Sequence, residues 1–264
     1  MQLADYDTTH KGATWHGYDL EGMVLDDCLL PGARFKNVDL RGAKIRGSLL
    51  IDVEITGEVD NLTVNGVDVS AFVEAELERR DPDRAKMRPT DPAGFREAWD
   101  ILERRWAETV ERARRLDPEL LHERVDGEWS FIETLRHLVF ATDAWIRRAL
   151  LGDPSPWSRL DLPHEDMGER PGVPNDTQAR PSLEEVLELR RDRMASMRRV
   201  VDELTDERLA EQTTVVEEPG YPNSAAFPVA DVVSTILNEE WMHRQYAERD
   251  LAVLEAGAEA GADA

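Results

Sequence analysis

The sequence contains a single cysteine, Cys28, among 264 residues. One cysteine excludes an internal disulfide framework and fits a reducing compartment. No apolar run approaches the roughly 18 residues that a membrane-spanning helix requires. The first residues, MQLADYDTTHKGATW, lack a basic start followed by an apolar segment, so no secretory signal is predicted. We therefore expect a cytoplasmic protein without a membrane partner.

Lysine is also scarce. Four of the 32 basic residues are lysines (Lys11, Lys36, Lys44 and Lys86), and 55 acidic residues bring the net charge to −23. Nucleic-acid binding requires clustered positive charge, so this composition argues against a nucleic-acid partner. The preference for arginine over lysine is typical of a GC-rich bacterial genome. With 41% hydrophobic residues, the chain can bury one large core or two modest ones.

A repeat of five residues runs without a gap from Ala13 to Gly57. Its nine pentads are ATWHG, YDLEG, MVLDD, CLLPG, ARFKN, VDLRG, AKIRG, SLLID and VEITG. The central residue is always apolar: Trp15, Leu20, Leu25, Leu30, Phe35, Leu40, Ile45, Leu50 and Ile55. The fifth residue is always Gly, Asp or Asn, which favours a turn. A period of five matches neither a helix nor a strand, so a coil with one pentad on each side is expected.

These pentads resemble the pentapeptide-repeat family, whose fold is a right-handed quadrilateral β-helix with four pentads per turn. The resemblance implies a short β-helix of a little over two turns within residues 1–70, with the central side chains pointing inward. Cys28 then takes an inward position as a small buried residue. The segment Glu58–Val69 alternates like a strand around Asn65-Gly66 and is expected to cap the coil. The coil could also dock a protein partner.

The rest of the chain is predicted to be helical. Residues 71–91 form a linker in which prolines interrupt any long helix. Four amphipathic helices are expected at about 92–116, 130–152, 182–204 and 228–251, and the tail 252–264 is expected to be disordered. Helices of this length indicate an all-α four-helix bundle over 92–251. The predicted fold class is therefore a two-domain β + α protein, a quadrilateral β-helix followed by the bundle.

Two long connections, 152–181 and 205–227, separate the later helices. Loops of this length inside a compact domain tend to be lids or binding loops. Both lie at, or close to, the same end of the predicted bundle. We expect them to frame a pocket there.

Three polar side chains fall on apolar helix faces. Glu239 and His243 are spaced by four residues on the same face as Val232 and Ile236, and His137 lies on the apolar face of the second bundle helix. An unpartnered carboxylate on such a face would cost several kcal/mol. The three residues together could hold a metal ion and leave one coordination position open, which is the pattern of catalytic sites.

Each of these residues also has an ordinary interpretation. A histidine on an apolar face is commonly a core residue bonded to the backbone. Glu239 could pair with Arg244 in the same helix or with an arginine of another helix. Glu133 is explained by a capping box with Ser130, so it is left out of the ligand set. A purely structural site would need a fourth protein ligand, for which only Glu133 or a loop residue is available.

The segments DGEWSFIETLRHLVFATDAWIRRAL and LNEEWMHRQYAERDL resemble the DinB-like superfamily of metal-binding four-helix bundles, over roughly residues 91–251. That family usually has a histidine on the second helix and His-x-x-x-His on the fourth. Here Glu239 replaces the first of the two fourth-helix histidines. The resulting His, Glu, His set is similar to that of mycothiol-dependent maleylpyruvate isomerase and its relatives. The resemblance implies a divalent transition metal, zinc or nickel, on His137, Glu239 and His243.

The implied function is that of a transferase or isomerase in which the metal activates a low-molecular-weight thiol toward a small electrophile. Mycothiol is the expected thiol if the composition reflects an actinobacterium. Trp129 and Trp241 flank the ligand positions and are candidates to wall the pocket, with packing in the bundle core as the alternative role expected for at least one of them. His164 and Asp166, in the first long loop, are candidate acids or bases by their location. The alternative is a non-catalytic interaction or scaffold protein that docks through the pentapeptide coil. The electrophile and the oligomeric state stay open.

Overall fold

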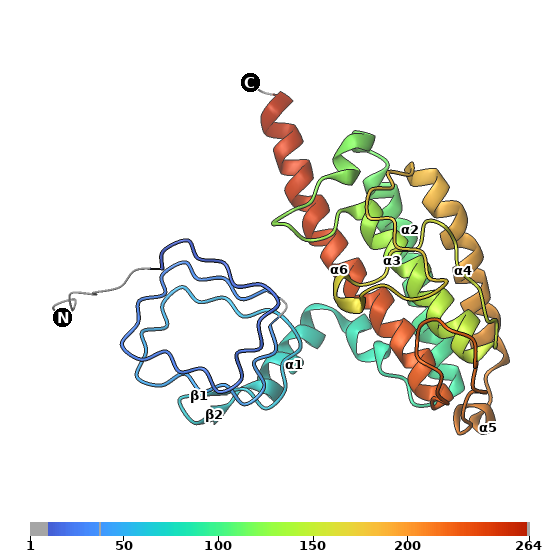
Figure 1. Cartoon of the computed structure of the whole chain (residues 1–264), viewed down its shortest axis with the longest axis horizontal. Coiled ribbons are helices and arrows are strands. Elements are labelled where there is room, and N and C mark those ends of the chain that lie inside the picture. Colours follow the sequence, from blue (N-terminus) through green and yellow to red (C-terminus); the bar gives the residue numbers. More distant parts are fainter. Residues whose placement is uncertain (1–9, 37, 263–264) are drawn as a thin grey trace. The chain divides into compact units, whose positions relative to one another are not determined.

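The computed structural model describes residues 10–36 and 38–262 (Figure 1). The chain divides into two compact units, Met1–Gly57 and Glu58–Ala264. This boundary lies 13 residues before residue 70, where the sequence predicts that the first domain ends. The domain limits 1–70, 71–91, 92–251 and 252–264 stay a prediction.

The N-terminal unit keeps the five-residue period in its backbone turns. Positive φ angles recur at the fifth position of the pentads, at Gly17, Gly22, Asp27, Gly32, Gly42, Gly47, Asp52 and Gly57. Local hydrogen bonds close several of these turns, such as Met23 N to Leu20 O at 3.0 Å and Ala43 N to Leu40 O at 3.0 Å. Figure 1 shows this unit as a wound trace of turns and extended segments. The described Gly and Asp positions therefore mark turns, as the repeat predicts, and Asn37 lies outside the described residues.

The predicted quadrilateral β-helix is wrong. Residues 10–36 and 38–57 form no strand, and their central apolar side chains are exposed to 56% at Trp15, 64% at Phe35 and 67% at Ile45. Cys28 is exposed as well, contrary to the expected inward position. Local backbone hydrogen bonds close several turns, but the apolar side chains between the turns do not meet in a closed interior. A pentapeptide-repeat fold is accordingly not shown.

The strands in the described residues are two short ones. β1 (Thr63–Val64) and β2 (Val67–Asp68) pair antiparallel, with Val64 opposite Val67. Asn65 and Gly66 connect them with φ angles of 51° and 82°. Two consecutive positive φ angles match the twist of a two-residue hairpin, as an Asn-Gly pair predicts.

The second unit is helical. Its elements are α1 (Ser70–Arg80), η1 (Pro82–Met87), α2 (Pro92–Ala113), η2 (Pro118–His122), α3 (Phe131–Thr142), η3 (Asp143–Leu150), η4 (Glu165–Met167), α4 (Leu183–Glu203), α5 (Asp206–Leu209) and α6 (Val229–Ala262). η3 is a π-helix that continues directly from α3, and the other η elements are 3-10 helices. None of the helices in the described ranges is both long and apolar enough to span a membrane. The four long helical segments occupy the positions predicted for the bundle.

Capping residues set where the bundle helices begin. Ser130 and Ser182 each form a complete capping box, with Glu133 and Glu185 respectively, and Asp91 accepts a hydrogen bond from Gly94 N. Each cap satisfies backbone N–H groups that have no partner within the helix. Because the α3 cap is fixed, the phase of the residues that follow it, including His137, is fixed as well.

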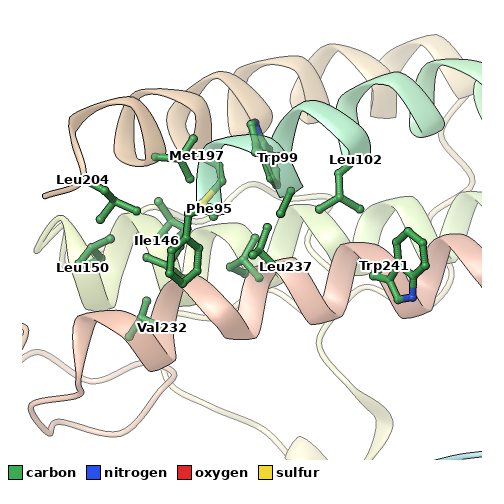
Figure 2. Packing of buried hydrophobic residues seen from close by; sticks show 14 of the residues in the cluster. Phe95, Trp99, Leu102, Ile146, Leu150, Met197, Leu204, Val232, Leu237 and Trp241 are labelled. Atoms are coloured by element: carbon green, nitrogen blue, oxygen red, sulfur yellow. The ribbon is translucent and has the colours of Figure 1, made fainter. Parts of the chain in front are cut away.

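The core lies between α2, α3–η3, α4 and α6 (Figure 2). Trp99 comes from α2, Ile146 from η3, Met197 from α4 and Leu237 from α6, and all four are almost fully buried. Because η3 continues α3, these contacts hold α6 beside the α3–η3 segment, where the candidate site lies.

α6 is longer than the sequence indicated. We expected the helix to end at Leu251 with a disordered tail over 252–264, but the helix continues to Ala262. Arg112 of α2 reaches across to this extension, donating hydrogen bonds from Nε and Nη2 to the two carboxylate oxygens of Glu255 at 2.7 and 2.6 Å. A bidentate pair of this kind supports a segment whose composition alone suggests disorder.

Candidate metal centre

The structure brings the three predicted ligands together. The carboxylate Oε2 of Glu239 lies 3.1 Å from His243 Nε2 and 3.4 Å from His137 Nε2. One ligand atom from each residue lies within 4.8 Å of the others. Atoms bound to one zinc ion at about 2 Å each lie up to about 4 Å apart, so the cluster is close to the size that a shared ion requires.

Two helices position these side chains. Glu239 and His243 are one turn apart on α6 and therefore share a face. His137 projects from α3, which packs along α6. The site is graded in exposure, because the side chain of His137 is 8% exposed, that of His243 18% and that of Glu239 30%. A substrate can therefore reach the site past Glu239 and His243 of α6, whereas the His137 side of the site is buried against α3.

The backbone of the long loop 152–181 completes the surroundings of His137. Nδ1–H of His137 donates a hydrogen bond to the carbonyl oxygen of Leu162 at 3.0 Å. A carbonyl can only accept, so the proton is on Nδ1 and the lone pair of Nε2 is directed at Glu239. Metal-binding histidines in proteins usually have such a partner on the second ring nitrogen.

Burial and charge oppose each other in this cluster. Burial lowers the pKa of His137, with hydrogen bonding to Glu239 acting the other way, so a neutral imidazole is favoured. For Glu239, burial raises the pKa, but hydrogen bonds and charge from His137 and His243 in their protonated forms outweigh it and hold the pKa well below its usual range. The carboxylate is therefore ionised throughout the neutral range.

A cation would satisfy the groups that face one another in this arrangement. With a neutral His137, the Nε2 lone pair and the Glu239 carboxylate face each other as two acceptors 3.4 Å apart. Two acceptors repel unless a proton or a metal ion lies between them. Two imidazole nitrogens and one carboxylate oxygen suit a divalent transition ion such as zinc or nickel and leave a coordination position free.

Glu133 does not belong to the site. Its carboxylate accepts hydrogen bonds from Ser130 N at 2.8 Å and from Nη2 of Arg124 at 2.7 Å. The residue is thus committed to the α3 cap, as the sequence indicated. In the described part of the chain, the group that could hold a metal ion comprises His137, Glu239 and His243.

The two tryptophans predicted to wall the pocket lie in different places. The ring of Trp129 packs 4.5 Å from the ring of His137 and 5.9 Å from that of His243, measured between centroids. Trp241 is buried in the core instead (Figure 2), below the guanidinium of Arg105. Trp129 therefore borders the ligands, whereas Trp241 contributes to packing.

The two long loops meet beside the site through aromatic contacts. His164, from the first loop, lies with its ring 5.6 Å from that of Tyr221 in the second. Tyr221 in turn lies 5.6 Å from Phe140, whose ring is 6.0 Å from His137. Burial, and after it the charge of Glu239, raises the pKa of Tyr221. The side chain of Asp166 lies outside the described residues.

Sequence reasoning missed the parts of the site that come from loops. The Leu162 carbonyl is a backbone group, which no residue type reveals. Tyr221 is an isolated aromatic residue between Gly220 and Pro222 in a segment without periodicity. The one available signal was the length of the two loops, which predicted a binding function but not the contact atoms.

The comparison with known proteins agrees with the helical unit. The family model of the DinB superfamily matches residues 101–247, which include all three ligand positions. No curated protein and no solved structure gives a match. Because the matched segment is more than half of the chain, the protein belongs to the DinB superfamily.

Proposed function

We propose that the protein is a divalent-metal-dependent enzyme, a transferase or isomerase, in which His137, Glu239 and His243 hold the ion. The observation that carries this proposal is the convergence of three ligand atoms within 4.8 Å, with the Nε2 lone pair of His137 directed at an ionised carboxylate. The superfamily match supports a metal-binding bundle in general terms. Zinc is our first expectation for the ion and nickel the second.

The chemistry follows from the donor set. A zinc ion bound there would lower the pKa of a coordinated thiol and so make thiolate available at neutral pH. The chain's own contribution is to place the ligands, to keep His137 neutral through burial, and to shield one side of the site with Trp129. The aromatic residues of the two loops, including Tyr221 and His164, lie where a small electrophile would pack.

The co-substrate is proposed to be a low-molecular-weight thiol, with mycothiol as the specific expectation from the arginine-rich composition. The electrophile is proposed to be small, in keeping with the aromatic rings that border the ligand atoms and the adjoining loops. His164 is proposed to transfer a proton there, since its ring contacts Tyr221 beside the site.

Metal content measured by inductively coupled plasma mass spectrometry tests this proposal first. Wild type purified without a histidine tag should contain about one transition metal ion per chain, and His243→Ala should lose it. His122→Ala is the matched control, because His122 lies at the end of η2, outside the ligand group. A metal-free wild type that takes up neither zinc nor nickel would contradict the proposal. A positive result justifies screening thiols against electrophiles.

A second candidate function rests on a different observation. The N-terminal unit exposes many large apolar side chains, among them Trp15, Leu49 and Ile51. Contiguous exposed apolar surface often marks a site of protein interaction. If the chain is a non-catalytic interaction protein that docks through this unit, His137→Ala will leave its partner binding unchanged. Removal of residues 1–57 will abolish that binding.

A further inference from the structure

Arg136 is the neighbour of a proposed metal ligand and has an unusual environment. Its side chain is fully buried, and no carboxylate pairs with it in the described residues. Burial accordingly lowers its pKa. Burying a guanidinium without an acidic partner is unfavourable unless other groups satisfy its N–H donors. Those groups are all backbone carbonyls of the loop 152–181.

The guanidinium ties the two arms of this loop together. Nε donates to Leu160 O at 2.9 Å on the outgoing arm. Nη2 donates to Asp176 O at 2.6 Å and Nη1 to Ala179 O at 3.2 Å on the returning arm. Arginine suits this task because its planar group presents several donors in a fixed geometry. A lysine at the same position could satisfy only part of the set.

The same short loop segment carries the carbonyl that orients His137. Arg136 and His137 are adjacent on α3, and their acceptors, Leu160 O and Leu162 O, are two residues apart in the loop. Two further features stiffen this segment. The side chain of Asp161 is buried and accepts a hydrogen bond from Ser158 N at 3.2 Å, and Pro163 restricts Leu162 to extended conformations.

We infer that Arg136 is a positioning residue for the metal centre. It holds the loop so that the Leu162 carbonyl accepts from Nδ1–H of His137, which leaves Nε2 free to bind the ion. This inference rests on the proposed function, because it assigns His137 as a ligand. It also makes a statement about the metal-free protein, namely that the His137 tautomer depends on Arg136.

Arg148 provides a matched control. It lies on η3, is as buried as Arg136, and likewise donates to loop carbonyls, those of Pro154 at 2.9 Å and of Glu218. Neither acceptor neighbours Leu162 in the sequence. Arg148→Lys should therefore weaken loop anchoring to a similar degree without disturbing His137. Comparing Arg136→Lys with Arg148→Lys therefore separates a specific effect on the orientation of His137 from a general effect of loop anchoring on stability.

The test uses two readouts on wild type, Arg136→Lys and Arg148→Lys. The first is nitrogen-15 NMR of the histidine rings in metal-free protein, with the His137 signals assigned by a His137→Gln variant. The second is zinc affinity, measured by competition with a chelator. Thermal melts of the two lysine variants establish that they are folded to a comparable extent.

We expect an Nδ1–H tautomer at His137 in wild type and in Arg148→Lys, and a mixture of tautomers in Arg136→Lys. Zinc affinity should fall about tenfold to a hundredfold in Arg136→Lys, as for other groups that orient a ligand, and stay within about twofold of wild type in Arg148→Lys. Equal tautomers and equal affinities in both variants would overturn the inference.

The outcomes for the two proposals are distinguishable. If wild type binds no zinc, the proposed function fails, and the tautomer measurement alone decides whether Arg136 positions His137. If Arg136→Lys does not fold, the wild-type tautomer still tests the inference. An Nε2–H tautomer at His137 in the metal-free protein contradicts it, and an Nδ1–H tautomer supports the hydrogen bond to Leu162 that it requires.

Discussion

The two units of this chain are both strictly periodic in sequence, yet they use their apolar residues in opposite ways. In the helical unit, Phe95 is 1% exposed, whereas Phe35, at the centre of a pentad, is 64% exposed. A spacing of three to four residues places apolar groups on one helix face that other helices can cover. A spacing of five sets the turns of the N-terminal unit, but its side chains find no common interior. A periodic sequence thus predicts the local backbone conformation more reliably than it predicts which side chains are buried.

The largest expected effect compares these two phenylalanines. Phe95→Ala should lower the free energy of unfolding by about 3 to 5 kcal/mol because it leaves a cavity in the core. Phe35→Ala should change it by less than about 0.5 kcal/mol, as is usual for exposed positions. Guanidinium denaturation followed by circular dichroism measures both values. A comparable loss at Phe35 would mean that the N-terminal unit has a packed interior after all.

A second contrast concerns ion pairs. Arg190 and Glu240 form a fully buried bidentate pair at 2.6 and 2.7 Å, whereas Arg41 and Asp39 pair at the surface. Glu240→Gln should destabilise the protein by about 3 kcal/mol or more, because it leaves a buried guanidinium uncompensated. Asp39→Asn should have no measurable effect in the same denaturation experiment. If Glu240→Gln lowers the free energy of unfolding only slightly, water reaches the guanidinium of Arg190.

The pH dependence of stability should come from the helical unit. Burial, and then the charge of Asp143, raises the pKa of Asp161 to about 8, and burial raises the pKa of Asp143 to about 6 in spite of its pair with Arg193. Both values exceed the unfolded one, so the folded state binds more protons between about pH 4 and 8. The resulting stability is complete below about pH 4, declines as the pH rises through 6, and is fully lost above about pH 8. Each carboxyl group that is protonated only in the folded state lowers the free energy of unfolding by about 1.4 kcal/mol per pH unit.

Asp161→Asn isolates this contribution. The amide is isosteric and stays neutral, so the variant should lose most of the decline in the free energy of unfolding between pH 5 and 8. Denaturant titrations at several pH values measure the slope. An unchanged slope in Asp161→Asn would assign the dependence to another group.

A more modest effect tests the view that the N-terminal unit depends on its backbone turns. Gly42 has a φ of 74° and open space around its missing side chain. Gly42→Ala should therefore cost only the left-handed backbone penalty, about 1 to 2 kcal/mol, and should exceed the effect of Phe35→Ala. Hydrogen exchange of the Ala43 amide, which bonds to Leu40 O, reports on this turn. Equal exchange in wild type and variant would contradict the prediction.

Part of the fold and part of the site follow from local sequence rules. The capping boxes at Ser130 and Ser182, the spacing of Trp99 and Leu102, and the Asn65-Gly66 hairpin depend on neighbours in the chain, and the structure contains each of them. The β-helix was wrong because closure of a coil depends on contacts between its turns. The end of α6 was misjudged because its support comes from Arg112, far away in the sequence.

The same division holds for the candidate metal centre. The sequence by itself determined that Glu239 and His243 share a helix face and that His137 points inward, because helical geometry relates residues one turn apart. Only the tertiary structure decided that α3 and α6 bring these groups within 4.8 Å, that Trp241 turns into the core, and that the Leu162 carbonyl meets His137. Those contacts join residues 25 to about 100 positions apart, and they exist only because buried side chains lock the helices and the loop in one arrangement.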